Sequence, residues 1–137
     1  DELLKSIENV YSNEHEKSLR IKQNYAVFLR NNTNNLEKAI FLLEEITHIR
    51  RKNNVPKDLA SVLTALGTTF LKAEIFDKAN EALKESVDIR SNLLANGDKD
   101  ILGSLISSLK RLGDLYQKTD QKEEMEKVAL EIKNLSA

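Results

Sequence analysis

A glycine recurs inside two helical stretches of this sequence in the same local frame. Gly67 and Gly113 each follow a leucine, and each precedes an aromatic residue by three positions, in the segments ALGTTF and RLGDLY. Because glycine weakens a helix by about 0.5 to 1 kcal/mol relative to alanine, a repeated helical glycine calls for a structural reason. We interpret each glycine as a point where a second helix crosses so closely that a side chain would hold the two backbones apart. The recurrence favours paired helices stacked in repeats over a casual glycine on a solvent face.

The rest of the repeat emerges when the sequence is compared with itself at fixed offsets. A slide of 46 residues superposes the residues around the two glycines, Leu63, Leu66 and Phe70 on Leu109, Leu112 and Tyr116. A slide of 40 residues superposes residues of the neighbouring helices, Ala39, Leu43, Ile49 and Arg50 on Ala79, Leu83, Ile89 and Arg90. We attribute the longer offset to one extra helical turn near Asp100, since a whole turn keeps every side chain on its face.

Apolar spacing predicts an all-α fold of about seven helices. Apolar residues recur three and four positions apart almost throughout, as from Leu36 to Ile49, and no run alternates with a period of two. The connections are short, so consecutive helices are expected to pack as antiparallel hairpins. The expected organisation is one domain over residues 1–137, with an orphan helix at 1–12 and repeats at 14–53, 56–94 and 98–136.

Single residues mark where several of these helices begin and end. Pro56 suits a first helical position, which needs no amide hydrogen, and Gly97 suits the C-terminal cap of the helix before it. Asn13 followed by Glu16 predicts a capping box at the start of the second helix. The asparagine-rich tract at residues 31–35 predicts a loop.

In these residues the chain resembles the tetratricopeptide repeat family. That family places a Leu-Gly pair and an aromatic residue in the first helix of each hairpin, and an aromatic, an alanine, a large apolar and a small residue in the second. The middle unit matches at Leu66, Gly67, Phe70, Phe76, Ala79, Leu83 and Ser86, the last at Leu112, Gly113, Tyr116, Met125, Ala129 and Ile132, and the earliest at Tyr25, Ala26, Leu29, Ala39, Leu43 and Ile46. The resemblance covers roughly residues 14 to 136, and its long period is similar to the variety found in kinesin light chains. It implies an α-solenoid of antiparallel helix hairpins.

Two further features bear on how the hairpins pack. Glu74 stands where the family usually has a glycine between helices, and Met125 replaces a small residue, so the last hairpin is expected to pack less tightly. Phe41 and Leu42 give the third helix apolar residues on a further face. This pattern indicates an internal helix with two neighbours.

Composition and motifs exclude several classes of function. The 21 basic and 22 acidic residues leave a net charge of −1. The chain therefore has no overall positive electrostatic potential that would attract nucleic acid or an anionic membrane. The lack of cysteine excludes disulfides and thiolate metal sites, and it favours an intracellular, cytoplasmic setting. His15 and His48 have no ligand partner at helical spacing, and no phosphate-binding glycine loop is present. We therefore predict no catalysis, no cofactor and no metal site.

Binding is the function that the resemblance implies. In the tetratricopeptide family the first helices of successive hairpins line a groove that takes an extended peptide or a helix. The corresponding positions here are Arg20, Gln23, Val27, Arg30, Ser61, Thr64, Thr68, Lys72, Ser107, Lys110, Arg111, Asp114 and Gln117. The family's carboxylate clamp for chaperone tails is not expected, because its positions hold Gln23, Val27, Ala65 and Ser107, with only Arg111 retained.

We therefore predict a noncatalytic scaffold that holds a peptide or helix segment of another protein, and this segment can be acidic. Binding to nucleic acid or to a membrane is not expected. Two alternatives remain open. One is a structural role in a longer or self-associating solenoid, whose first helix would dock on an upstream hairpin through Leu3, Leu4 and Ile7. The chain begins at Asp1 without a methionine, so we expect it to be part of a longer protein. The other alternative is a regulator domain that senses a small peptide.

Overall fold

The computed structural model describes residues 1–10 and 15–137, and all regular structure in these ranges is helical. The elements are α1 (Glu2–Val10), α2 (Glu16–Asn32), α3 (Leu36–Asn53), α4 (Pro56–Lys72), α5 (Phe76–Ala95), the 3₁₀ helix η1 (Lys99–Ile101), α6 (Leu102–Lys118) and α7 (Lys122–Leu135). The all-α prediction of about seven helices is confirmed.

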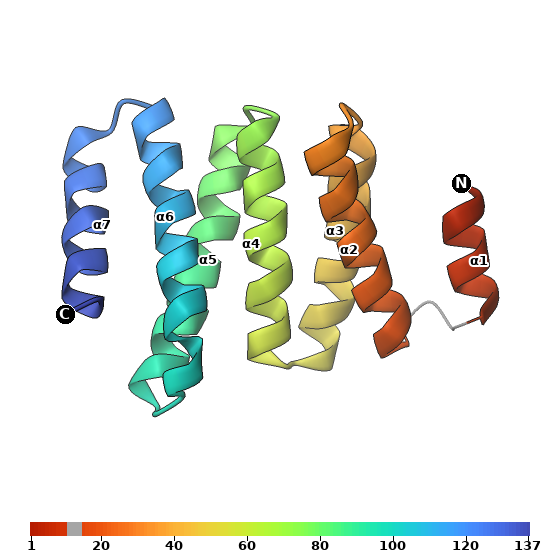
Figure 1. Cartoon of the computed structure of the whole chain (residues 1–137), viewed down its shortest axis with the longest axis horizontal. Helices are drawn as coiled ribbons and strands as arrows, with labels where there is room; N and C mark the ends of the chain where they lie inside the picture. The colour runs from red at the N-terminus through yellow and green to blue at the C-terminus, as the bar shows by residue number, and fades with distance from the viewer. Residues whose placement is uncertain (11–14) are drawn as a thin grey trace.

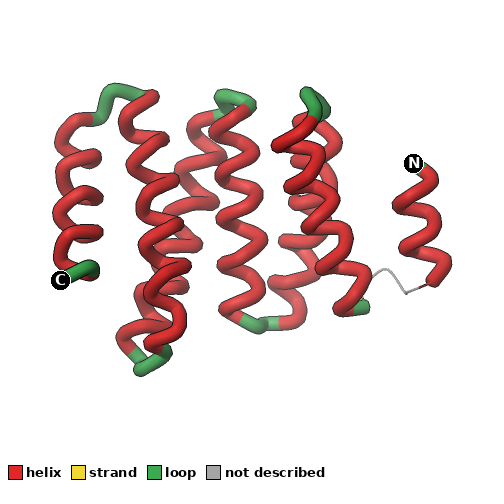
Figure 2. The backbone as a smooth tube through the Cα atoms, viewed as in Figure 1, coloured by secondary structure: helices red, strands yellow, loops and turns green. Residues whose placement is uncertain are grey.

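The helices form a row of antiparallel hairpins, most of them in two layers (Figure 1). α2 packs on α3, α4 on α5 and α6 on α7, and successive hairpins meet through α3 with α4 and α5 with α6. The first helices α2, α4 and α6 also contact one another in turn and make one face of the molecule, which we call the inner face. The loops lie at the two ends of the helices (Figure 2). This arrangement is the α-solenoid that the repeat predicted.

The apolar stripes of the helices meet in one continuous core. Removing such side chains from water stabilises the fold by about 25 cal/mol per Å² of apolar surface. The large apolar residues with almost no exposure are Leu19, Leu43, Ile46, Val62, Leu83, Leu105, Leu109 and Leu115. Ala26, Ala39 and Ala79 are fully buried as well. These small residues let neighbouring helices approach one another.

Gly67 lies where α4 crosses α5 at very close range. A Cβ atom at this position would lie 2.6 Å from Leu83 Cγ and 3.3 Å from the backbone nitrogen of Leu83. The prediction for Gly67 is therefore confirmed. At Gly113 a Cβ atom would lie 3.6 Å from Val128 Cγ1, which is an ordinary contact. The prediction that close crossing requires Gly113 is wrong, because the nearest part of α7 leaves room for a methyl group there.

The extra turn between the repeats is a 3₁₀ helix rather than a longer α-helix. α4 and α6 each have 17 residues, and η1 holds the added residues around Asp100. η1 follows Gly97, whose φ of 101° is one that a residue with a side chain rarely adopts. The tight turn absorbs the insertion, so α6 begins in the register that the repeat predicted.

Single residues mark the starts of three helices, and Pro56 was predicted for the place it takes. α4 begins at Pro56, and the side chain of Asn35 caps α3. The N-cap of α2 is His15, whose Nδ1 accepts a hydrogen bond from the amide of Lys17 at 3.2 Å. Asn13, which was predicted to cap this helix, lies outside the described residues.

Two hairpin turns place a residue other than glycine in the left-handed region. Glu74 has a φ of 62° and Asp120 a φ of 55°. After Glu74 the amide of Ile75 donates to the carbonyl of Phe70 at 2.9 Å, which is the hydrogen bond of a Schellman cap. Both turns therefore carry a Cβ atom in a conformation that suits glycine better.

Replacing Glu74 by glycine is expected to raise the free energy of unfolding by about 1 kcal/mol, because glycine adopts a positive φ without a Cβ clash. The Glu74→Ala variant is the matched control, since it removes the same charge but keeps the Cβ atom. Urea unfolding followed by circular dichroism measures both changes. Equal effects of the two substitutions would contradict the conformational explanation.

α1 docks on the first hairpin through Asp1, the residue before it, and through its own apolar side. The carboxylate of Asp1 accepts a hydrogen bond from the hydroxyl of Tyr25. Leu4 packs against the core and Ile7 is buried, whereas Leu3 is exposed. The prediction that Ile7 is available to dock on an upstream hairpin is therefore wrong, whereas docking through the exposed Leu3 and the half-buried Leu4 stays a prediction.

Candidate binding face

The inner face carries a polar pocket of about 280 Å³, which we call the inner pocket. α2, α4 and α6 all supply side chains to it, because residues at helical spacing share one face of each helix. Its lining residues are Val27, Arg30, Ser61, Thr64, Ala65, Thr68, Arg90, Ser104, Ser107 and Arg111. Seven of the thirteen predicted groove positions are among them.

A second pocket of about 570 Å³, the side pocket, adjoins the inner pocket along α4 and α6. The two pockets share Thr68 and Arg111 in their linings. Leu71 and Lys118, which were not predicted, also line the side pocket. Three further predicted groove positions lie there, namely Lys72, Asp114 and Gln117.

Three predicted groove positions lie outside both pockets. Arg20 is exposed, and its Nε lies 3.7 Å from a carboxylate oxygen of Glu16. Lys110 is exposed on α6. Gln23 is half-buried, and its side-chain amide donates to the hydroxyl of Ser61 at 3.1 Å. Gln23 therefore ties α2 to α4 rather than lining a cavity.

Arg90 lines the inner pocket, although it was not among the predicted residues. It lies on α5, in the second helix of its hairpin, and is only 8% exposed. Its Nη1 donates to the carbonyl of Ser104 at 2.9 Å and to the hydroxyl of Ser108. One sequence feature could have pointed to Arg90, namely its match with Arg50 at a slide of 40 residues. An arginine that recurs in the frame of buried apolar residues indicates a specific role, because arginine is rarely buried unless it is paired.

A buried network of hydroxyl groups lies next to the inner pocket and joins α4, α5 and α6. The hydroxyls of Thr64 and Ser86 are 2.6 Å apart, and that of Ser108 lies 3.3 Å from each of them. Ser86 Oγ also donates to the carbonyl of Ala60 at 3.0 Å. Because buried hydroxyl groups are costly unless they are hydrogen-bonded, this network holds the three helices in place beside the pocket.

The inner pocket is electropositive. Arg30, Arg90 and Arg111 line it, and its lining includes no aspartate or glutamate. Burial lowers the pKa of Arg90, and burial followed by the charge of Arg111 lowers the pKa of Arg30. Guanidinium groups remain protonated at neutral pH even so, and the three positive charges therefore persist.

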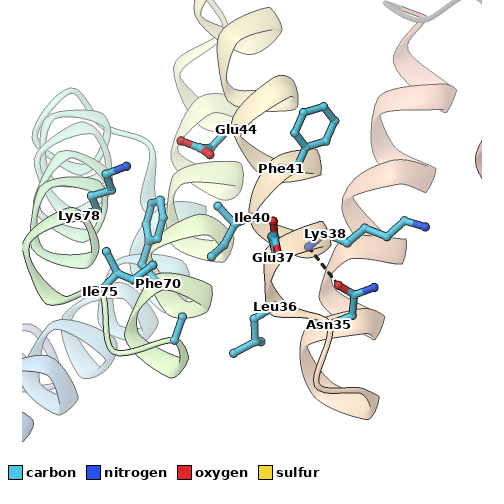
Figure 3. Close-up of a pocket in the computed structure, with 11 residues that line it drawn as sticks. Asn35, Leu36, Glu37, Lys38, Ile40, Phe41, Glu44, Phe70, Ile75 and Lys78 are labelled. Atoms are coloured by element: carbon cyan, nitrogen blue, oxygen red, sulfur yellow. Dashed lines mark hydrogen bonds between the residues drawn. The ribbon is translucent and has the colours of Figure 1, made fainter.

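An outer pocket of about 670 Å³ lies between α3, the end of α4 and the start of α5 (Figure 3). Phe41 and Ile75 line it and are both exposed, Phe41 to 66%. The prediction that Phe41 meets a second helix is therefore wrong, whereas Leu42 is buried as expected. The ammonium group of Lys78 lies 5.7 Å from the centre of the Phe70 ring. None of the predicted groove residues lies in the outer pocket.

Within residues 1–10 and 15–137, no group of three or more His, Asp or Glu side chains could hold a metal ion. No helix in those ranges is long and apolar enough to cross a membrane. The two histidines lie on different helices, His15 at the start of α2 and His48 exposed on α3.

Comparison with known proteins identifies the fold. No protein-family model matches the sequence, and no curated protein matches it. One similar solved structure is a variant of the nearly identical TPR-like repeats of a kinesin light chain from Podosopora anserina, with a TM-score of 0.80 at 21% identity. The match covers 99% of this chain and 65% of that chain, so this chain spans less than two thirds of that structure's length. Another crystal structure of such repeats has a TM-score of 0.59 at 15% identity and covers 99% of this chain and 83% of that one. The chain thus has the fold of tetratricopeptide-like repeats of the kinesin light-chain kind.

Proposed function

We propose that this chain is a noncatalytic interaction module that holds a peptide or helix segment of a partner protein on its inner face. The module spans residues 1–137, with repeats at 14–53, 56–94 and 98–136 behind the helix at 1–12. The observation that carries the proposal is that the inner pocket and the side pocket adjoin at Thr68 and Arg111. A bound segment can therefore lie across α4 and α6 without interruption.

The chemistry of the two pockets suits a polar segment that carries negative charge. The apolar residues that line them are Val27, Ala65 and Leu71. Most of the other lining residues offer hydroxyl, guanidinium or ammonium donors, which hydrogen-bond to backbone carbonyls and to acidic side chains. Recognition is thus expected to depend on polar contacts and to weaken as the salt concentration rises.

Peptides selected from a displayed random library against the purified chain test this proposal. Replacing Thr68 by tryptophan fills the junction of the two pockets and is expected to weaken binding of the selected peptides by about tenfold or more. The Lys84→Trp variant is the matched control, because Lys84 is exposed on α5 and lines neither pocket. Fluorescence polarisation measures the affinities, and circular dichroism checks that both variants are folded.

The site of binding is mapped by amide chemical shifts in the labelled chain. Shifts gathered on Thr64, Ser107 and Gln117 would support the inner face as the binding site. Equal affinities of wild type and the Thr68→Trp variant, or shifts gathered around Phe41 in the outer pocket, would contradict the proposal.

Self-association is the second candidate, and the exposed Phe41 in the outer pocket favours it. Ile75 is also exposed in this pocket, and exposed apolar residues that lie together are a common feature of surfaces that join two protein copies. Light scattering over a range of concentrations measures the molar mass of wild type and of a Phe41→Ser variant. A concentration-dependent rise in mass that the substitution abolishes would support self-association, whereas a strict monomer would exclude it.

A further inference from the structure

Arg90 is a buried arginine without an anionic partner. It forms no ion pair with any of the described residues, and its hydrogen bonds go to the neutral oxygens of Ser104 and Ser108. Its Nε is buried and has no hydrogen-bond partner, as is also true of Arg50 Nε in the preceding hairpin, so the difference between the two arginines is the missing carboxylate. Burying an unpaired guanidinium is costly, and an anion in the adjoining cavity would offset that cost.

Arg50 occupies the matching place in the preceding hairpin and shows what Arg90 lacks. Nη1 of Arg50 lies 2.6 Å from a carboxylate oxygen of Glu16 and 3.5 Å from one of Asp58. The slide of 46 residues that defines the repeat places Ser104 where Asp58 stands. Arg90 therefore meets a backbone carbonyl where Arg50 meets a carboxylate. The anion that the chain itself supplies in one hairpin is missing from the next.

The other two arginines of the inner pocket are also poorly neutralised. Arg30 donates to the side chain of Asn31 at 3.1 Å and to the carbonyl of Ala65 at 3.4 Å, and it has no carboxylate partner among the described residues. Arg111 lies 3.5 Å from Asp114, in a pair that is exposed on both sides and hence weak. The charges of Arg30 and Arg111 are close enough to repel each other.

We propose that the inner pocket binds the phosphoryl group of a phosphorylated side chain, held by Arg30, Arg90 and Arg111. A phosphoryl group carries a charge of about −1.5 to −2 at neutral pH and three strong acceptor oxygens. It therefore matches several guanidinium groups better than a single carboxylate does. The hydroxyls of Ser61 and Ser107, which also line the pocket, supply further donors.

The source of this phosphoryl group is a segment of a partner protein, and in that respect the inference rests on the proposed function. The inner pocket opens into the side pocket at Thr68 and Arg111, so the chain on either side of a phosphorylated residue has a surface to follow. Lys72 and Lys118 in the side pocket suit acidic residues that flank such a site.

Titration of the ¹⁵N-labelled chain with inorganic phosphate tests the pocket independently of any peptide. Phosphate is expected to shift the amides of Thr64, Thr68 and Ser107 in a saturable manner. Acetate at the same ionic strength is expected to bind at least about tenfold more weakly. Equal responses to the two anions, or phosphate shifts spread evenly over basic residues elsewhere, would overturn the proposal.

A double variant, Arg30→Gln with Arg111→Gln, removes two of the three charges while leaving the buried Arg90 in place. It is expected to bind phosphate at least about tenfold more weakly than wild type. The Lys84→Gln variant changes one charge on the exposed side of α5 and is expected to bind phosphate as wild type does. An unchanged affinity in the double variant would overturn the assignment of Arg30 and Arg111.

A peptide that binds the inner face, prepared with and without one phosphoserine, tests the source. Phosphorylation is expected to tighten binding by about tenfold or more, and the double variant is expected to lose that gain. No gain from phosphorylation, or binding to vesicles that contain phosphatidic acid without binding to the phosphopeptide, would overturn a phosphorylated protein as the source.

The two sets of results separate this inference from the proposed function. Peptide binding without a response to phosphate would overturn the phosphoryl site and leave the interaction module standing. A phosphate site in a chain that binds no peptide would overturn the module, and with it the phosphorylated segment as the source.

Discussion

Replacing Gly67 by alanine is expected to lower the free energy of unfolding by about 1–2 kcal/mol. The added methyl group would lie 2.6 Å from Leu83 Cγ and 2.8 Å from Leu83 Cδ2. Leu83 is fully buried, so it cannot turn aside without displacing its own neighbours. Overpacking of this kind costs about 1–3 kcal/mol, of which the better helix propensity of alanine offsets about 0.5–1 kcal/mol. Urea unfolding followed by circular dichroism measures the change.

Gly113→Ala is the matched control, and it is expected to raise the free energy of unfolding by about 0.5–1 kcal/mol. Its new methyl group would meet Val128 Cγ1 at 3.6 Å, a normal contact distance. Combining Gly67→Ala with Leu83→Ala is expected to cost less than the sum of the two single changes, because the truncated leucine makes room for the methyl group. Similar losses at both glycines, or strict additivity in the double variant, would show that close crossing is not the reason for Gly67.

Replacing Arg50 by alanine is expected to lower the free energy of unfolding by about 2–3 kcal/mol, the range for a buried charged hydrogen-bond partner. Its guanidinium donates to both carboxylate oxygens of Glu16, at 2.6 and 3.0 Å, and so joins α3 to the start of α2. The side chain of Arg50 is only 4% exposed, whereas that of Glu16 is 49% exposed. Water can hydrate the carboxylate left behind, which keeps the loss below that for a fully buried pair.

The neighbouring pair of Arg51 and Glu85 provides the control. It is also bidentate, with hydrogen bonds of 2.6 and 2.7 Å, but the side chain of Arg51 is 49% exposed and that of Glu85 is 37% exposed. Arg51→Ala is therefore expected to cost less than about 1 kcal/mol. If the two alanine variants lost equal stability, burial would not be the cause of the larger effect at Arg50.

The pair of Arg50 and Glu16 also makes stability depend on pH. The hydrogen bond from Arg50 holds the pKa of Glu16 below its usual value of 4.5. As the pH falls, Glu16 therefore takes up a proton in the unfolded chain before it does so in the folded chain. The contribution of the pair to the free energy of unfolding is complete above about pH 4.5 and is lost as the pH falls through the lowered pKa of Glu16. The urea midpoint of the Arg50→Ala variant is accordingly expected to fall less steeply with acid than that of wild type.

Much of the fold could be predicted from the sequence because it depends on local spacing. The helices follow the apolar period, α4 begins at Pro56, and short connections make neighbouring helices antiparallel. Ten of the thirteen predicted groove positions line the inner or the side pocket, since the register of a helix determines which side chains share a face. That these residues bind a partner stays a prediction.

The contacts between helices could not be derived in this way. Gly67 and Gly113 stand in the same sequence frame, yet a side chain meets close contact only at Gly67. Arg90 reaches the inner pocket from the second helix of its hairpin, and Phe41 remains exposed on a helix that was expected to be covered. The sequence by itself determined the helices, their order and the faces they present. Only the tertiary structure decided which faces meet and how closely, because those distances depend on side chains that lie far apart along the chain.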